Sequence, residues 1–292
     1  KHLSSVLPKS LHDAPSSFSV SDDPDQSNEE VSLTNVMNRG REKPMGFFDH
    51  LEEMRWMLIK CAIVFAIFAA LIGYFLREFN DVLLWPLNTV QHEYPTVAMI
   101  LGTNSAVEVF NVVFQMCLMG GLVLAAPFML IFIGQFVSPA LTEKELKVVL
   151  PLCFSAFVLF MMGATFGFFI LMPGALRTAV DLNTMFHYEF RWTAGSYYTL
   201  MAWLVLGVGG TFEFPLLIVL LVWLGIMTTA FLRKYRKHAI VVIVIIAAVV
   251  TPTTDPLNML FMATPLYVLY EIAILVGSRM EKVRAARNAA SR

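Results

Sequence analysis

Two long stretches of the sequence contain no charged residue. Asp, Glu, Lys and Arg are absent from residues 109–142 and again from residues 148–176. Each stretch is longer than the roughly 20 apolar residues that cross a bilayer as an α-helix. The whole chain is 57% hydrophobic and 15% charged, whereas about 25% of the residues of a soluble domain are charged. These features predict an all-α polytopic membrane protein.

The apolar segments predict six transmembrane helices, of which the last two are short. Their expected ranges are about 56–75, 108–136, 149–171, 196–224, 238–250 and 257–276. The fifth helix would be roughly 20 Å long at 1.5 Å per residue, which is less than the roughly 30 Å thickness of a hydrocarbon core. Two alternatives fit this short pair: the bilayer is thinned around it, or the pair forms a re-entrant hairpin.

Basic residues are distributed unevenly between the segments. Lys and Arg are frequent before the first segment, between the second and third, between the fourth and fifth, and after the sixth. The loops on the other side contain only Arg77, Arg177 and Arg191. Because Lys and Arg are enriched in cytoplasmic loops, both termini are expected in the cytoplasm.

The sequence changes character at both ends of the membrane domain. Residues 1–44 are rich in Ser, Asp, Asn and Pro and poor in large apolar residues, a composition typical of disorder. Their acidic residues argue against an organellar transit peptide. We therefore expect a disordered cytoplasmic tail at 1–44, a six-helix membrane domain at 45–278 and a basic cytoplasmic tail at 279–292.

Two acidic motifs are predicted to face the cytoplasm. One is DHLEEMR at 49–55, and the other lies within SPALTEKELKVVLP at 138–151. Carboxylates pair most strongly with guanidinium groups, so the motifs suggest a receptor for a cationic ligand. The alternative is that they only begin helices, because Asp49 and Glu52 have capping-box spacing, and so do Thr142 and Glu145.

A single acidic residue, Glu213, lies within the fourth apolar segment. No other charged residue occurs between Arg191 and Arg233. An ionisable group at this depth costs about 2.5–3.5 kcal/mol on insertion scales and usually faces a bundle interior or a water-filled cavity. Pro215 removes a helical hydrogen bond just beyond it, so a bend is expected. Glu213 is therefore either an intramembrane polar site or a protonated side chain bonded to a neighbouring helix.

Few other residues suggest chemistry. Asp255, in TPTTDP, is expected in a turn. Cys61, Cys117 and Cys153 lie in apolar segments without metal or redox spacing. The sequence contains no nucleotide-binding loop, catalytic-triad spacing or haem motif. We therefore predict no enzymatic activity, no cofactor, no metal and no nucleic-acid partner.

The sequence HLEEMRWML at 50–58 resembles the amino-terminal signature of the TatC family, a subunit of the twin-arginine protein translocase. Four further blocks resemble that family and follow in the same order: FVSPALTEKELKVVLP, GTFEFPLLIVLLVWLGI, TPTTDP and PLYVLYEI. Together they cover about residues 46–276. The signature commonly has Leu and Arg where this chain has Met54 and Met57.

The resemblance implies a cup-shaped bundle that acts as core receptor of the translocase in a bacterial inner membrane. The receptor binds signal peptides that carry two consecutive arginines, on folded precursor proteins, and transport is driven by the protonmotive force. The implied signal-peptide-binding residues are Glu53, Arg55, Phe136, Pro139, Leu141 and Glu145. Glu213 would face the concave side within the membrane, and Asp255 would lie in a periplasmic turn or partner contact. The implied partners are single-span TatA- and TatB-type subunits, other TatC copies and the lipid bilayer.

A proton-coupled small-molecule transporter that uses Glu213 is the alternative from another functional class. Such transporters often contain inverted repeats and paired broken helices. No repeat relates the two halves of this sequence, because the long segments come first and the short ones last. Neutralising Glu213 should abolish a transporter, whereas a receptor should depend more on Glu53 and Glu145.

Overall fold

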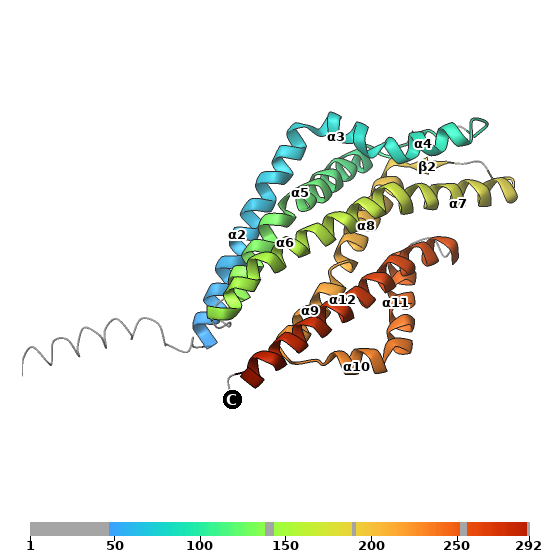
Figure 1. The fold of residues 1–292 in the computed structure, drawn as a ribbon. Coiled ribbons are helices and arrows are strands. Elements are labelled where there is room, and N and C mark those ends of the chain that lie inside the picture. The colour runs from blue at the N-terminus through green and yellow to red at the C-terminus, as the bar shows by residue number, and fades with distance from the viewer. Residues whose placement is uncertain (1–46, 98, 138–142, 189–190, 252–255, 291–292) are drawn as a thin grey trace, which may run out of the picture. The chain divides into compact units, whose positions relative to one another are not determined.

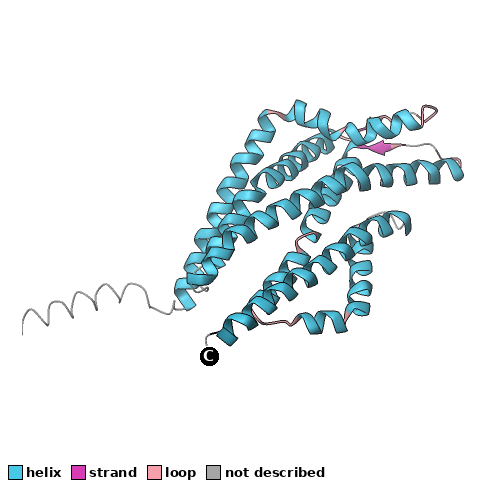
Figure 2. Ribbon diagram, viewed as in Figure 1, coloured by secondary structure: helices cyan, strands magenta, loops and turns pink. Residues whose placement is uncertain are grey.

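The computed structural model describes residues 47–97, 99–137, 143–188, 191–251 and 256–290, and most of them are helical (Figures 1 and 2). The predicted tail at 1–44 lies outside these residues. The chain divides into two units, residues 1–51 and residues 52–292. The packing described below is that of the second unit.

Twelve helical elements and two short strands follow one another along the described residues. The helical elements are α2 (Phe47–Tyr74), α3 (Leu76–Leu83), α4 (Trp85–Glu93), α5 (Ala106–Val137), α6 (Glu143–Phe166), the π-helix η2 (Gly167–Leu171), α7 (Met172–Met185), α8 (Ala194–Thr211), α9 (Phe214–Trp223), α10 (Thr229–Lys234), α11 (Arg236–Val250) and α12 (Pro256–Ala290). The strands β1 (Leu101–Gly102) and β2 (Trp192–Thr193) form one parallel pair.

Among the described residues, five segments are long and apolar enough to cross a membrane: His50–Tyr74, Ala106–Phe136, Val149–Met185, Ala194–Trp223 and Pro256–Val283. They confirm a multi-pass α-helical protein and agree with five of the six predicted segments. The remaining predicted segment corresponds to α11, which has 15 residues, so the count of six crossings stays a prediction. The helix α12 extends beyond the predicted range of 257–276.

The third membrane segment continues further than its apolar run. The helix α6 leads without interruption into η2 and then α7 (Figure 1). Pro173, at the start of α7, cannot donate a backbone hydrogen bond, and the widened π-turn accommodates this break in the helical pattern. Gly167 allows close packing there, because a Cβ atom on it would lie 2.8 Å from the Leu204 carbonyl oxygen of α8.

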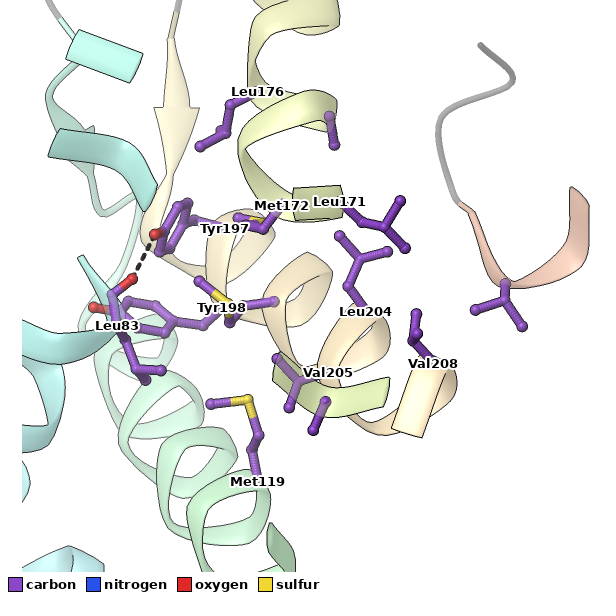
Figure 3. Packing of buried hydrophobic residues seen from close by; sticks show 14 of the residues in the cluster. Leu83, Met119, Leu171, Met172, Leu176, Tyr197, Tyr198, Leu204, Val205 and Val208 are labelled. Atoms are coloured by element: carbon purple, nitrogen blue, oxygen red, sulfur yellow. Dashed lines mark hydrogen bonds between the residues drawn. The ribbon is translucent and has the colours of Figure 1, made fainter. Parts of the chain in front are cut away.

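The main apolar core surrounds α8. Tyr197, Met201, Leu204 and Val208 are fully buried on this helix, which packs against α5, α6 and η2. Figure 3 shows Tyr197, Leu204 and Val208 together with core residues from α5, η2 and α7. The Tyr197 hydroxyl donates a hydrogen bond to the Leu83 carbonyl oxygen over 2.6 Å. This bond links the centre of the core to the end of α3.

A smaller core joins the last four helices. Val222, Leu232, Tyr270 and Ile274 are buried together. Polar contacts reinforce this cluster: a Glu281 carboxylate oxygen accepts the Thr229 backbone N–H at 2.9 Å, the Tyr270 hydroxyl donates to the Leu232 carbonyl oxygen at 3.0 Å, and Arg236 pairs with Glu271 at 2.8 Å. The short helix α10 is therefore fixed to α12.

An ion pair joins the end of α4 to α7. The Arg177 guanidinium donates to both carboxylate oxygens of Glu93, at 2.7 and 2.8 Å. Nearby, the Tyr94 hydroxyl donates to Asp181 at 2.9 Å. The bond from Arg177 holds the pKa of Glu93 below its ordinary value, because it favours the ionised carboxylate.

Candidate functional site

A small cavity lies where the amino-terminal part of α2 meets the carboxyl-terminal part of α5. Its volume is about 140 Å³. It is lined by Glu53, Trp56, Met57 and Lys60 of α2 and by Phe132, Gln135 and Phe136 of α5. We call it the Glu53 cavity, because Glu53 is its one carboxylate.

The spacing of the lining residues follows from helix geometry. Residues three, four and seven positions apart lie on the same face of an α-helix. The α2 residues at 53, 56, 57 and 60 and the α5 residues at 132, 135 and 136 both obey this spacing. The cavity is therefore formed by two facing helical stripes.

Away from the cavity, close contacts between α2 and α5 fix how the two helices pack. A Cβ atom on Gly121 of α5 would lie 2.8 Å from the Cα atom of Ala69 on α2, so the two backbones nearly touch there. The rings of Phe68 and Phe128 stack with their centroids 5.5 Å apart. These contacts hold α2 against α5 and so determine the width of the Glu53 cavity.

The Glu53 carboxylate is incompletely satisfied. Its Oε2 atom is buried and has no hydrogen-bond partner among the described residues. A buried carboxylate without a donor or a cation is unfavourable, because it has lost its hydration without forming a hydrogen bond or ion pair. The same cavity is also lined by the cationic residue Lys60 and the polar residue Gln135. The arrangement is suited to binding a cationic donor group.

The structure places only part of the predicted signal-peptide set. Phe136 lines the same cavity as Glu53. Arg55 is exposed and is absent from the lining, because two positions along a helix point to nearly opposite sides. Glu145 lies in the first turns of α6; its side chain, together with Pro139, Leu141 and Asp255, lies outside the described structure.

Trp56, Lys60, Phe132 and Gln135 were not predicted as site residues. The signal for the α2 members was present in the sequence, since Trp56 and Lys60 follow Glu53 at helical spacing. The α5 members belong to a continuous apolar segment, and only the contact between the helices shows which of its faces meets α2. Among the described side chains, no three His, Cys, Asp or Glu residues lie close enough together to hold a metal ion.

Glu213 occupies a separate place in the fold. The helix α8 ends at Thr211 and α9 begins at Phe214, so the helix is interrupted at the place where the sequence predicts a bend. Glu213 lies between these two helices, and its Oε1 atom is buried without a hydrogen-bond partner among the described residues. It is not part of the Glu53 cavity.

Comparisons with known proteins agree with the resemblance. Residues 49–265 match the family model for the Sec-independent protein translocase protein (TatC). The TatC proteins of Koribacter versatilis and Aquifex aeolicus are 31% and 32% identical to this chain, each over 80% of it, and these alignments cover 86% and 95% of those proteins. A crystal structure described as the twin arginine translocase receptor TatC matches with a TM-score of 0.66 and 32% identity. That match covers 80% of this chain and 99% of the other.

Proposed function

Because this chain belongs to the TatC family of Sec-independent protein translocase proteins, we propose that it is the signal-peptide receptor of a twin-arginine translocase. In this proposal the Glu53 cavity binds one arginine of the twin-arginine signal. The family relationship makes the chain a multi-pass membrane component of the translocase. The same relationship does not favour a small-molecule transporter, since the relatives are protein translocase subunits.

The buried, unpartnered oxygen of Glu53 is the observation that carries the proposal. A guanidinium group offers two parallel N–H donors to a carboxylate, and this bidentate pairing is stronger and more directional than an ammonium contact. Trp56 and Phe136 line the cavity beside the carboxylate, and the face of an aromatic ring attracts a cation. An arginine side chain would therefore satisfy Glu53 and stack on its neighbours.

We assign the second arginine of the signal to Glu145. This residue follows closely on the segment 138–142 that joins α5 to α6, and Phe136 stands at the other end of that segment. Pro139 and Leu141, within the segment, complete the proposed binding region, and Arg55 is proposed to contact its rim.

The proposed arrangement in the membrane follows from the distribution of basic residues. Both termini, the tails at 1–44 and 279–292 and the Glu53 cavity face the cytoplasm of a bacterium, and six helices within residues 45–278 cross the inner membrane. Single-span TatA- and TatB-type subunits and further TatC copies are the proposed partners, and the protonmotive force drives transport. Asp255 would lie in a turn on the periplasmic side.

Glu213 has a different proposed role. It lies at the break between α8 and α9 within an apolar segment, and its buried oxygen lacks a partner among the described residues. We propose that Glu213 pairs with a polar group of an inserted signal peptide or of a partner helix.

Photocrosslinking tests the receptor function. A photoreactive group is placed next to the arginine pair of a twin-arginine precursor, which is then mixed with membranes that contain this protein. We expect Glu53→Gln to reduce crosslinking to this chain by about tenfold or more, since a buried charged hydrogen bond is lost. Replacing the arginine pair with two lysines should have a similar effect.

Glu52→Gln is the matched control. Glu52 is a neighbouring acid on α2 that is exposed and does not line the cavity, so this variant should crosslink like the wild type. If Glu53→Gln also crosslinks like the wild type, the cavity does not bind the signal. If the folded wild type forms no crosslink at all, the receptor function itself is wrong, and transport dependent on Glu213 becomes the next hypothesis to test.

A further inference from the structure

We propose that Lys60 is an affinity-lowering residue of the Glu53 cavity: its ammonium group opposes the incoming guanidinium and so weakens the binding of the signal peptide. The proposal rests on the function proposed above and concerns the same site. It follows from one unusual feature, which is that the cavity expected to receive a cation already contains one.

The two charged residues lie on one face of α2. Lys60 follows Glu53 by seven positions, which is two helical turns and about 10 Å along the axis. Long side chains on a helix lean toward its amino terminus, so the Lys60 stem is directed toward Glu53. Both residues line the same cavity of about 140 Å³.

Lys60 does not satisfy Glu53 directly. The Oε2 atom of Glu53 has no hydrogen-bond partner among the described residues, although Lys60 lines the same space. The carboxylate therefore remains open to a ligand, while the ammonium group acts on that ligand through space. Lys60 is exposed and Glu53 is half-buried, so the ammonium group is free to change position while the carboxylate is held in the cavity.

The size of this opposition is set by Coulomb's law. Two cations on the order of 8 Å apart repel each other enough to reduce affinity by about twofold to thirtyfold, for effective dielectric constants between 80 and 20. A bidentate guanidinium pair with Glu53 offsets this repulsion better than a single ammonium contact does. In this proposal, Lys60 prevents ligands that make only a single ammonium contact from binding Glu53 appreciably. It also speeds the release of a bound arginine.

Direct binding measurements test the proposal. A fluorescent peptide with the twin-arginine sequence is titrated against the protein in nanodiscs, and its anisotropy gives the dissociation constant. Lys60→Met removes the charge and keeps an unbranched side chain of similar length. We expect this variant to bind the peptide about threefold to tenfold more tightly than the wild type does.

Three further variants separate the charge of Lys60 from a structural effect. Lys60→Arg keeps the cation and should bind like the wild type. Lys237→Met removes an exposed cation outside the cavity lining and should leave the affinity unchanged at physiological salt. In a Glu53→Gln background, Lys60→Met should no longer raise the affinity, because the guanidinium then has no partner in the cavity.

The outcomes distinguish the two proposals. If the wild type does not bind the peptide, or binds it equally with Glu53→Gln, the proposed receptor site fails. If binding depends on Glu53 but Lys60→Met leaves the affinity unchanged or lowers it, the receptor site stands and the role of Lys60 is wrong. In that case the Lys60 stem only extends along α2 to place its charge at the membrane surface. An equal gain with Lys237→Met would likewise overturn the proposal, because it would show a general charge effect.

Discussion

Glu53 and Glu213 each have a buried carboxylate oxygen without a hydrogen-bond partner among the described residues, yet their surroundings differ. Glu53 shares its cavity with an ammonium, an amide and aromatic rings from two helices. Glu213 lies at a break between two apolar helices. A carboxylate with polar neighbours in a cavity suits a charged ligand, whereas a carboxylate at a helix break suits a polar group that enters from within the membrane. The two residues therefore belong to different steps of the proposed activity.

The ion pair between Glu93 and Arg177 predicts a pH-dependent stability. The pKa of Glu93 is lowered in the folded protein, so the pair stabilises the fold above the unfolded pKa, and the contribution is lost as the pH falls through the folded pKa. Both side chains are 41% exposed, so solvent screening limits the pair to less than about 1 kcal/mol. We expect Arg177→Gln to lower the unfolding temperature at pH 7 by about 2 °C.

That difference between the variant and the wild type should begin to shrink near pH 4, the ordinary pKa of glutamate, and disappear once the pH lies below the lowered pKa of Glu93 in the folded protein. Thermal unfolding in detergent across this pH range measures it. Arg77→Gln is the control, since Arg77 is exposed on α3 and should have no effect at any pH. A difference that stays constant down to pH 3 would mean that Arg177 stabilises the fold through packing of its stem.

At the level of elements, the sequence predicted the long apolar helices and the short helix α11, and it missed α3, α4, α7 and α10. The runs around α2, α5, α6 and α8–α9 were recognised because a membrane helix needs only length and apolarity. An irregularity near Glu213 was expected because Pro215 cannot donate a backbone hydrogen bond, and the helix is interrupted there. The helices α3, α4 and α7 are amphipathic or mixed in composition, and they pack on other helices, so their sequences resemble loops between spans. The close approach of Gly167 to Leu204 of α8 is a contact between distant parts of the chain, which no local pattern reveals.

The contact of α2 with α5 predicts a sensitive glycine. Gly121→Ala would place a Cβ atom 2.8 Å from the backbone of Ala69, so α2 would have to move away from α5. Overpacking of this kind typically costs about 1–3 kcal/mol. We expect a lower unfolding temperature and weaker binding of the twin-arginine peptide, because the Glu53 cavity would widen.

Gly210→Ala is the matched control for this prediction. Gly210 also lies in a helix, but a Cβ atom there would meet nothing within 4 Å. Alanine in a helix is favoured over glycine by about 0.5–1 kcal/mol, so this variant should be as stable as the wild type or more stable. If Gly121→Ala matches Gly210→Ala in both stability and peptide binding, the α2–α5 contact does not control the cavity.

At the scale of the whole molecule, the candidate site could be predicted only in part from the sequence. Glu53 and Phe136 were found because each belongs to a recognisable motif, and the structure brings them together. Lys60 was not predicted as a site residue, because its neighbours on α5 were unknown. A cavity between two helices depends on which faces meet, and the largely apolar sequence of α5 does not show which of its faces meets α2.

The number of membrane crossings decides which side of the membrane each end of the chain occupies. The helix α11 has 15 residues and is about 22 Å long, which is shorter than a hydrocarbon core of roughly 30 Å. Both of its ends are nevertheless fixed to other helices. Arg236 at its start pairs with Glu271, and the Trp203 indole N–H donates to the carbonyl oxygen of Val250 at its end. We predict that α11 crosses a locally thinned bilayer, so that both termini face the cytoplasm. Single cysteines at Ser19, Thr96 and Ser291, in a protein whose three native cysteines are replaced by alanine, test this with a membrane-impermeant thiol reagent. Ser19→Cys and Ser291→Cys should react only in inside-out vesicles and Thr96→Cys only in right-side-out vesicles. If Ser291→Cys reacts together with Thr96→Cys, the chain crosses the membrane an odd number of times and α11 does not span it.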